Sequence, residues 1–367
     1  KLRNFFRTKT RIVNLIDFGG HKVFDATVDT NVMLFQKGEL QKEYQLPYVN
    51  IESDFTGDNL DGYVSTKQHS IIQNELSDSG WTLADDKVLT LKKKIENIGM
   101  PLKDWDVRIN YGIKTGFNEA FIIDTLTKER LCAEDQKSVE ILKPILRGRD
   151  IQRYSCKWAG LWLIKIESGW TDKNRGKKDP EKFFKDTYLS VYEHLKSMGD
   201  KKGKGKGLYN RDDQGDYWWE LRDCDYYSEF EKEKIVYPVI GTQGTFCYDF
   251  SGYFHNDKAF HLTGNYLMFL ISILNSQLAF WYLLKIGSGL GKEGFEFRKI
   301  YLELLPIPKI SESEQQPFVT LVNQILSLKK SDPNADTSTL EAEIDRMVYE
   351  LYGLTDDEMA IVEGKKE

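Results

Sequence analysis

Hydrophobic positions along the chain follow two spacings, and each spacing predicts a different element. Residues 11–18 (RIVNLIDF) and 26–36 (ATVDTNVMLFQ) concentrate apolar residues in short runs, which predicts two strands joined through glycines and a polar turn. Residues 82–98 instead repeat apolar positions every three or four residues, and Gly99 with Pro101 ends that helical pattern. The first hundred residues therefore predict the edge of a sheet and a connector with one amphipathic helix.

Between residues 106 and 307 the pattern becomes mixed. Strand-like blocks alternate with loops: VRINYGI, EAFIID, LWLIKI, KIVYPVI and TFCYDF. The longest apolar run, residues 266–284, approaches the length of a membrane span. Asn275, Ser276 and Gln277 interrupt its centre, and Ser276 can cap a second helix. We therefore expect two buried helices rather than a membrane helix, in a domain that mixes helices and strands.

The last part of the chain returns to helical spacing. Residues 317–330 carry apolar side chains on one helical face, and a second helix is predicted to begin at a capping box of Ser338 and Glu341. Thr355 and Glu358 have the same spacing and predict a short final helix. We expect a helical hairpin whose acidic outer face is solvated.

Charge is divided unevenly along the chain. Residues 311–367 hold 13 acidic and 5 basic residues, a net of −8, so residues 1–310 carry +2 of the chain's total of −6. The acidic total therefore does not argue against a nucleic-acid partner for the larger part. Four widely spaced cysteines without a C-x-x-C pair, and five scattered histidines, predict reduced thiols in a cytoplasmic protein and no metal site.

The stretch YGIKTGFNEAFIID contains Lys114-Thr115-Gly116, which imitates two catalytic motifs. A phosphate loop needs a glycine directly before its lysine and a helix directly after its threonine, whereas Ile113 precedes Lys114 and FNEAFIID has the pattern of a strand. A serine β-lactamase needs a Ser-Asp-Asn element, which the chain lacks. No proline is followed by aspartate, so a PD-(D/E)xK nuclease is not indicated either. We expect no catalytic, cofactor-binding or metal-binding residues in this chain.

The same stretch predicts a β-hairpin. Apolar residues alternate on both sides of residues 114–118, which we expect at or near the tip. Gly112 and Gly116 are then positions that tolerate a positive φ or a close backbone approach.

The most basic segment is MGDKKGKGKGLYNR, residues 198–211. Its glycines predict a mobile loop, and its positive charge can neutralise phosphates and release counterions. A solvated loop without a ligand is the alternative. The segment DYWWELRDCDYY follows directly and brings aromatic residues, either core or exposed for stacking, next to Arg222. The basic side chains of the loop are Lys201, Lys202, Lys204, Lys206 and Arg211.

A second basic element is ILKPILRGRDIQRY, residues 141–154. Arg147 and Arg149 lie on either side of a turn at Gly148, and a planar guanidinium suits phosphate oxygens as well as the O6/N7 edge of guanine. An ion pair between Arg149 and Asp150 is the competing explanation.

The order of these segments resembles a known family. The segments DFGGHKVFDATVDTNVMLF, PLKDW, INYGIKTGFNEAFIID, ILKPILRGRDIQRY, WWELRDC, ILNSQLAFWYL, LPIP and LEAEIDRMVYELYGLTDDE follow one another as in the C-terminal part of type IIG restriction-modification enzymes. These are adenine-specific DNA methyltransferases with a TaqI-like target-recognition domain. The resemblance covers nearly the whole chain, and GIKTGFNEAFIID followed by PILRGRDI is its most specific part.

The resemblance implies a clamp around DNA. A methyltransferase domain binds S-adenosylmethionine and an extruded adenine, while the recognition domain reads the duplex from the other side. The chain has no Asn-Pro-Pro-aromatic motif and no glycine loop of the S-adenosylmethionine type, so we expect S-adenosylmethionine only in the parent protein, together with Mg²⁺ if a nuclease domain is present. The expected partners are double-stranded DNA and the N-terminal methyltransferase and nuclease domains of the same polypeptide, of which this chain is expected to be a fragment without activity of its own.

By this resemblance, the fold class is α+β, with four successive parts. Residues 1–45 are the end of an α/β methyltransferase core, residues 46–105 a connector, residues 106–310 a mixed-sheet DNA target-recognition domain with flanking helices, and residues 311–367 a C-terminal helical segment.

The predicted DNA contacts come from several of these motifs. They are Lys114 and Thr115 in the turn, Arg147 and Arg149, the basic side chains of residues 198–211, Trp218, and Gln243 in the GTQGT turn, where glutamine can read an adenine edge. Two alternatives stay open. One is the specificity part of a nuclease-free phage-defence adenine methyltransferase, and the other is a protein-interaction scaffold that does not bind DNA.

Overall fold

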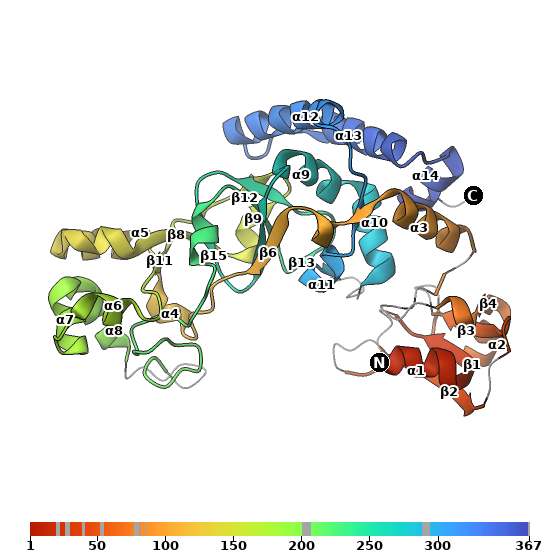
Figure 1. Ribbon diagram of the computed structural model, residues 1–367, viewed down its shortest axis with the longest axis horizontal. Coiled ribbons are helices and arrows are strands. Elements are labelled where there is room, and N and C mark those ends of the chain that lie inside the picture. Colours follow the sequence, from red (N-terminus) through yellow and green to blue (C-terminus); the bar gives the residue numbers. More distant parts are fainter. Residues whose placement is uncertain are drawn as a thin grey trace.

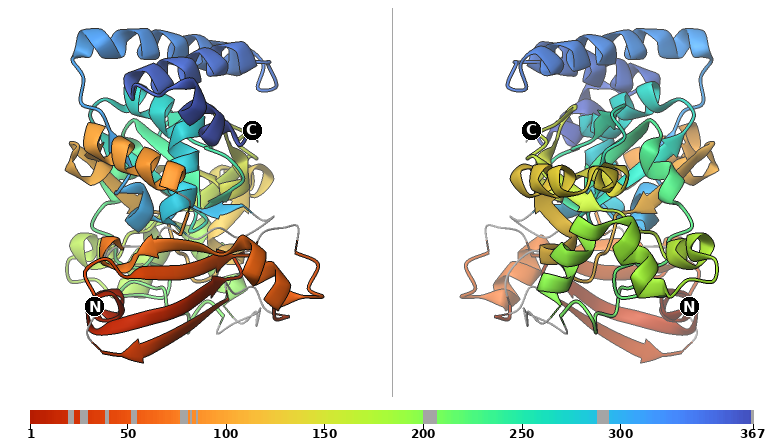
Figure 2. Two further views of the ribbon diagram at one scale, coloured as in Figure 1. Left: turned by 90° about the vertical axis from the view of Figure 1, so that its right-hand side faces the viewer. Right: turned by 90° about the vertical axis from the view of Figure 1, so that its left-hand side faces the viewer.

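The computed structural model consists of four parts (Figure 1). An N-terminal sheet comes first, a distal lobe and a central lobe form the middle, and the C-terminal helices lie along the central lobe on the side away from the N-terminal sheet (Figure 2). The structure describes residues 1–365 apart from residues 20–22, 26–29, 39–40, 52–54, 77–80, 82, 85, 200–206 and 288–293.

The described part of the N-terminal sheet has the strand order β2-β1-β3-β4. β2 is antiparallel to β1, whereas β3 is parallel to β1 and antiparallel to β4. The two strands predicted before residue 37 are confirmed, and the sheet continues beyond the predicted boundary at residue 45 because QLPYVN pairs back onto β1. The elements are α1 (Leu2–Lys9), β1 (Thr10–Asp17), β2 (Asn31–Lys37), β3 (Gln45–Asn50), α2 (Leu60–Lys67), β4 (His69–Ile72) and η1 (Gln73–Glu75).

A buried glutamine fastens α1 to this sheet. The Gln73 side chain accepts a hydrogen bond from Ile12 N at 2.9 Å and donates to the carbonyls of Phe6, Arg7 and Thr10. The carbonyls at the C-terminal end of a helix lack partners within the helix, so this one amide supplies the donors that the end of α1 needs.

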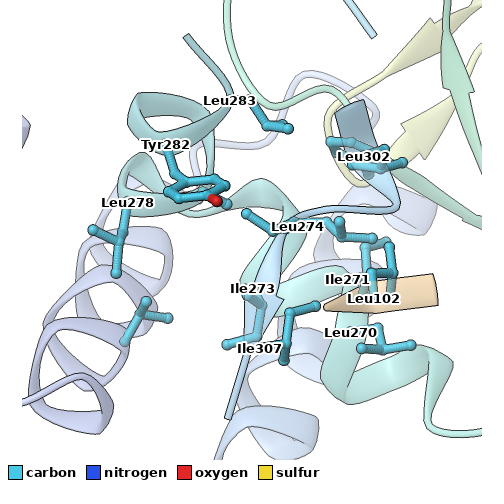
Figure 3. Packing of buried hydrophobic residues seen from close by; sticks show 14 of the residues in the cluster. Leu102, Leu270, Ile271, Ile273, Leu274, Leu278, Tyr282, Leu283, Leu302 and Ile307 are labelled. Carbon is cyan, nitrogen blue, oxygen red and sulfur yellow. The ribbon is translucent and has the colours of Figure 1, made fainter. Parts of the chain in front are cut away.

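The central lobe is built on an antiparallel sheet of order β14-β12-β16-β6. Two buried helices, α9 and α10, pack against it as predicted, and Ser276 caps α10 by accepting a hydrogen bond from Ala279 N at 3.1 Å. Figure 3 shows Leu270 and Ile271 of α9 close to Leu102, which precedes the sheet in the chain. The elements are β6 (Val107–Tyr111), β12 (Lys234–Pro238), β14 (Cys247–Asp249), β16 (Ala259–Gly264), α9 (Leu267–Asn275) and α10 (Gln277–Ile286).

The apolar run at residues 266–284 is divided between α9 and α10. Among the described residues, no single helix is long and apolar enough to cross a membrane, and these two reach that length and composition only as a pair bent by 70°. Most of their side chains are buried in the core of the central lobe.

The C-terminal helices complete this core. Val322 and Ile325 of α12 and Ile344 and Val348 of α13 are buried in the same cluster as α9 and α10. The helix predicted before Gly99 is confirmed as α3, which joins them through Lys94 Nζ and the carboxylate of α14 residue Glu358, 2.6 Å apart. The bounds are α3 (Asp86–Ile98), α12 (Glu312–Ser331), α13 (Ser338–Leu351) and α14 (Asp356–Glu363).

The predicted caps of these helices are only partly correct. The capping box of Thr355 and Glu358 is confirmed at the start of α14. The box predicted at Ser338 is wrong, because Thr337 precedes the first turn of α13 and donates its hydroxyl to Glu341 Oε1 at 2.6 Å. Thr337 and Ser338 are adjacent hydroxyl residues that lie four and three positions before Glu341, and both are close enough to be candidates for the cap.

The distal lobe contains another four-stranded sheet, of order β15-β8-β11-β7, and a group of helices. Stacked aromatic rings fill its core: Phe184 lies 5.2 Å from Trp219, and Phe230 lies 4.9 Å from Phe254, between ring centres. The elements are α4 (Asn118–Phe121), β7 (Ile122–Asp124), α5 (Thr125–Glu134), η3 (Gln136–Ile141), β8 (Leu142–Leu146), β11 (Leu161–Ile164), α6 (Trp170–Arg175), α7 (Pro180–Thr187), α8 (Leu189–Met198), η5 (Tyr227–Glu231) and β15 (Phe254–His255).

Short elements fasten the loops around both lobes. Three two-residue strand pairs occur among the described residues: β10 with β9, β13 with β17, and β18 with β5. The bounds are β5 (Met100–Pro101), η2 (Leu102–Asp104), η4 (Gly148–Asp150), β9 (Ile151–Gln152), β10 (Ser155–Cys156), β13 (Ile240–Gly241), β17 (Phe295–Glu296), α11 (Lys299–Leu302) and β18 (Pro306–Ile307).

The hairpin predicted around residues 114–118 is wrong. β6 pairs with β16 in the central lobe, whereas β7 pairs with β11 in the distal lobe. The helical turn α4 lies between them and lets Phe121 and Ile123 reach the distal core without facing β6. Alternation marks which side chains are buried, but it does not identify the partner strand. The stretch therefore crosses from one lobe to the other.

Candidate nucleic-acid interface

The two lobes meet at a turn of three residues. β15 pairs with β8 in the distal lobe, and β16 begins in the central lobe, so residues 256–258 carry the chain from one sheet to the other. Ile113, just after β6, donates its N–H to His255 O at 2.8 Å and forms an isolated bridge with Asn256. The turn is therefore held by segments of both lobes.

Two glycines let neighbouring loops approach this turn closely. A Cβ on Gly112 would lie 1.9 Å from Asn256 O, and a Cβ on Gly148 would lie 2.4 Å from Lys258 O. No side chain fits at such distances, and the predicted close approach at Gly112 is confirmed. We name the exposed region here the junction surface. It comprises residues 111–114, 147–150, 222–227 and 256–258.

Arg147 and Arg149 have different surroundings on the junction surface. Arg147 makes a two-pronged ion pair with Asp150, whose carboxylate also accepts from Arg147 N at 2.8 Å. These hydrogen bonds raise the pKa of Arg147. The alternative of an Arg149–Asp150 pair is wrong: Arg149 is exposed and has no hydrogen bond or ion pair with any residue that the structure describes. Of the two, Arg149 is the one free to bind a ligand.

Lys114 and Thr115 also differ in exposure: Lys114 lies at the surface and Thr115 in the interior. Lys114 Nζ lies 5.7 Å from the centre of the Tyr111 ring, without an ion-pair partner in the described part of the chain. Thr115 is buried, and its hydroxyl donates to Asn118 Oδ1 at 2.7 Å and accepts from Phe117 N at 3.1 Å. The predicted DNA contact at Thr115 is therefore corrected, because its hydrogen bonds shape the turn from inside.

Arg211 lies in the interior of the distal lobe. Its side chain is 3% exposed, and burial lowers its pKa to about 10. The predicted DNA contact at Arg211 is corrected, because moving it to solvent would leave several backbone carbonyls without donors. The guanidinium lies 4.6 Å from the centre of the Phe121 ring. It donates to the carbonyls of Leu208, Asp213, Trp218 and Glu220.

The lysines predicted to bind DNA, Lys201, Lys202, Lys204 and Lys206, lie outside the described residues. The described residues on either side of them are close together, since a Cβ on Gly199 would lie 2.0 Å from Tyr209 Oη. Gly116 has a φ of +68°, as predicted, and a Cβ there would lie 2.9 Å from Arg211 Cδ. Residues 207–211 therefore run next to the turn that carries Lys114.

Trp218 is half-buried. Its ring meets Tyr209 and Trp219 edge-on, with ring centres 5.0 and 5.2 Å apart, and Lys196 Nζ lies 5.4 Å from its centre. These neighbours hold the ring in place and leave part of it in contact with solvent. Its role as a DNA contact stays a prediction.

Gln243 is exposed in its turn but lies apart from the junction surface. It lines a pocket with Arg153 and Glu341, and this pocket shares no lining residue with the pocket at Lys114. The Arg153 guanidinium is held there by Glu341 and by the carbonyls of Gly244 and Asn275. The structure thus brings Lys114 and Arg149 to one surface and places Gln243 at another.

Two exposed cations of the junction surface, Lys258 and Arg222, are not among the DNA contacts predicted from the sequence. Lys258 is 70% exposed, with Asp257 Oδ2 3.3 Å from its ammonium, and Arg222 is 49% exposed, 3.2 Å from Asp213. A single lysine in a short turn leaves no pattern in sequence. Arg222 does leave one, because it follows the aromatic segment that the sequence marks as a possible stacking surface.

Two buried histidines lie beneath the junction surface. His255 Nε2 and His261 Nδ1 are 2.8 Å apart, and His261 Nε2 is 3.4 Å from Asn110 Nδ2. Burial lowers the pKa of both rings, that of His255 to about 3, and the nearby Lys234 lowers both pKa values further. The pair therefore stays neutral at pH 7 and joins β15 of one lobe to β16 of the other.

Comparison with known proteins gives one family match and similar solved structures. Residues 143–307 match the TaqI-like C-terminal specificity domain. No curated protein matches the chain. The structure of the type IIL restriction-modification enzyme MmeI in complex with DNA has a TM-score of 0.54 and 10% identity, over 96% of this chain and 44% of that one. For the type IIG restriction endonuclease BpuSI the TM-score is 0.42 and the identity 15%, over 95% and 44%.

The structural similarity concerns the fold, and the family match concerns residues 143–307. The chain spans less than half the length of the MmeI and BpuSI chains. At 10% identity the likeness to MmeI shows a shared fold, which agrees with the predicted α+β class. The matched residues 143–307 contain three of the four segments of the junction surface and most of both lobes. Residues 143–307 of this chain are therefore similar to the TaqI-like C-terminal specificity domain.

Proposed function

We propose that the chain recognises double-stranded DNA as the specificity part of a type IIG-like restriction-modification enzyme. The observation that carries the proposal is the match of residues 143–307 to the TaqI-like specificity domain. The similar fold of MmeI, whose structure is of a complex with DNA, supports it. This chain would then supply the sequence reading that a separate catalytic domain needs.

The junction surface is the part of the described chain that best suits this role. Lys114 and Arg222 line its pocket, and the exposed Arg149 and Lys258 lie at the close approach of Gly148 to the turn that joins the two sheets. Lysine and arginine contacts to phosphates fix a protein on the duplex, and arginine also reads guanine. Because acidic residues lie between these cations, we expect moderate affinity with defined placement rather than strong non-specific binding.

The test is binding of the purified chain to a random-sequence duplex at two salt concentrations. We expect binding near roughly 50 mM salt that weakens at roughly 200 mM, with log K falling by about 0.9 per log unit of salt for each phosphate contacted. No binding at the lower concentration would contradict the proposal and favour a protein-interaction scaffold.

A charge-matched pair of variants locates the interface. Lys114→Ala should weaken binding, because it removes a cation of the junction surface, whereas Lys137→Ala removes an exposed cation from η3 of the distal lobe and should not. Equal loss in both variants would place the interface elsewhere.

The activity of the parent protein is a further part of the proposal: S-adenosylmethionine-dependent methylation of adenine N6, with or without DNA cleavage. The described residues do not fit a cofactor site of the usual strand-glycine loop-helix kind, because β1 continues into the antiparallel strand β2. Gly19 has a φ of +49° and open space around it, and among the described residues no helix begins directly after it. Another part of the parent would have to hold S-adenosylmethionine, and this chain alone should transfer no methyl group to DNA.

The exposed strand β2 supports further protein next to the N-terminal sheet. Val32, Leu34 and Phe35 are 54%, 59% and 47% exposed, and they lie on both faces of an edge strand. A strand that is apolar on both faces is typical of the interior of a sheet covered on both sides. We infer that the methyltransferase part of the parent packs here, and that V32S/L34S reduces self-association of the isolated chain in sedimentation.

A further inference from the structure

A pocket of about 450 Å³ opens on the junction surface, between the two lobes. Residues 111–114, which follow β6 of the central lobe, form one wall, and residues 222–227, which lead into η5 of the distal lobe, form the other. Pockets that bind small ligands usually have volumes of roughly 300 to 1,000 Å³, so this one has room for a single nucleotide.

Two tyrosine rings line the pocket and are supported from behind. Tyr111 packs edge-on against Phe260, with ring centres 4.9 Å apart, and Tyr226 stacks on Phe230 at 6.1 Å. Both tyrosines remain half-buried, so part of each ring is open to the pocket. Nucleobases stack on such rings irrespective of their identity, because every base has a flat π-face.

The polar groups of the pocket have both signs of charge. Lys114 and Arg222 are cations, and Asp223 and Asp225 are exposed carboxylates without a hydrogen bond to any described residue. A plain anion would be repelled by the two carboxylates, and a plain cation by Lys114 and Arg222. A nucleotide satisfies both pairs, because its phosphate is negative while the pairing edge of every base carries at least one N–H donor.

Both walls are fixed before any ligand arrives. Tyr227 Oη donates to Arg222 O at 2.9 Å, which holds the second wall onto the distal core. Ile113 N donates to His255 O at 2.8 Å and holds the first wall onto the junction. A preformed site of this kind loses little side-chain or loop entropy on binding.

We propose that this pocket binds one nucleotide turned out of the DNA duplex, with its base against Tyr111 and Tyr226 and its phosphate near Lys114 and Arg222. This inference rests on the proposed DNA recognition and adds a binding site in the specificity domain. The site is separate from any pocket that a methyltransferase domain provides for its target adenine. It reads the base through Asp223 and Asp225.

The test compares two duplexes that differ in one unpaired nucleotide. A bulged nucleotide has already lost its pairing, so a pocket for an extrahelical base should bind the bulged duplex roughly tenfold more tightly than the fully paired duplex. Using the ratio of the two affinities removes the general phosphate attraction, which is common to both.

Variants connect this ratio to the pocket. Tyr226→Ala should bring the ratio close to one, and D225N, a surface change that leaves the core intact, should reduce it as well. Lys137→Ala is the control and should keep the wild-type ratio. A second readout places 5-iodouracil at the bulge, where irradiation should couple it to Tyr111 or Tyr226, as mapped by mass spectrometry of the peptides.

The outcomes separate this inference from the function on which it rests. Equal affinity for both duplexes, or a ratio that survives in Tyr226→Ala and D225N, overturns the pocket while DNA recognition stands. Coupling of iodouracil only to residues outside the pocket overturns it as well. Failure to bind either duplex at low salt overturns the proposed function and the pocket together.

Discussion

Basic residues occur both in the interior behind the lobe junction and on its surface, but they differ in their hydrogen-bond and ion-pair partners. Behind the junction surface, Arg211 and the histidine pair have protein partners for their polar atoms and are nearly inaccessible. On the surface, Arg149 and Lys114 have no ion-pair partner in the part of the chain that the structure describes. Two arginines that look equivalent in sequence therefore have different surroundings: Arg211 is bonded inside the protein, and Arg149 is exposed. What separates them is the set of carbonyls that surrounds each side chain.

The largest expected effect comes from removing the interior arginine. Arg211→Met keeps the volume and deletes the charge, and it should lower the free energy of unfolding by roughly 3–5 kcal/mol, because several buried carbonyls lose their donor. Urea denaturation followed by tryptophan fluorescence measures this change. Arg222→Met, at an exposed position of the same segment, is the matched control. A loss below 1 kcal/mol in Arg211→Met would show that this arginine is not an interior support.

The second-largest expected effect is a loss of folding stability at acidic pH. In the folded protein, the pKa values of His255 and His261 lie below 6.5. Between these values and pH 6.5 the unfolded chain therefore binds more protons than the folded chain. Stability is then complete above pH 6.5 and falls as the pH drops from there towards 3. The loss should be about 1.4 kcal/mol per histidine at pH 5.5. Chemical denaturation at pH 7.0 and 5.5 tests this, with His69→Gln, an exposed histidine, as a control that should keep the same pH dependence.

A smaller effect is expected when Arg147 loses its ion pair and its guanidinium becomes free to bind a ligand. Asp150→Asn removes its ion pair and should cost about 1 kcal/mol of stability. The freed guanidinium should also tighten DNA binding at low salt and steepen the dependence of log K on log salt by up to about 0.9. Asp179→Asn, the same substitution at the N-cap of α7, should leave DNA binding unchanged. Weaker binding in Asp150→Asn would indicate that the ordered turn matters more than the freed charge.

The smallest effect on stability should come from Arg149. Arg149→Ala should change the free energy of unfolding by less than about 0.5 kcal/mol, since no described partner is lost. Its DNA affinity should fall, with a salt dependence shallower by about 0.9 if the guanidinium contacts a phosphate. Arg130→Ala on α5 is the control for an exposed arginine outside the junction surface. Unchanged affinity in Arg149→Ala would remove this residue from the interface.

Local patterns in the sequence predicted the elements whose burial depends on their own neighbours. The α3 helix, β1 with β2, and the α9–α10 pair with its Ser276 cap follow from apolar spacing and capping chemistry alone. A strand was also predicted within EAFIID, where β7 lies, but its pairing was not, because its partner β11 lies far along the chain and alternation has no information on partners. The first residues of the predicted strand EAFIID form the helical turn α4 instead.

The candidate site was predictable only in part. Arg149 was correctly expected at the Gly148 turn, whereas Lys114 was expected at the tip of a hairpin that β6 and β7 do not form. Thr115 and Arg211 were predicted at the surface, yet their polar atoms are bonded inside the protein. A run of charge shows where positive residues are frequent, but only folding shows which carbonyls gather around one of them. The pocket walls come from segments about a hundred residues apart, and nothing in their separate sequences indicates that they meet.

Under the proposed DNA recognition, the packing of α12, α13 and α14 bears on how target specificity could be exchanged between similar proteins. These helices share one core with α3, α9 and α10, although the family match ends at residue 307. A graft of residues 143–307 alone would cut through that core and leave Val322 and Val348 against a foreign surface. The transplantable unit therefore runs from α3 to α14, and exchanges confined to the surface turns should be tolerated more readily than exchanges of the matched segment.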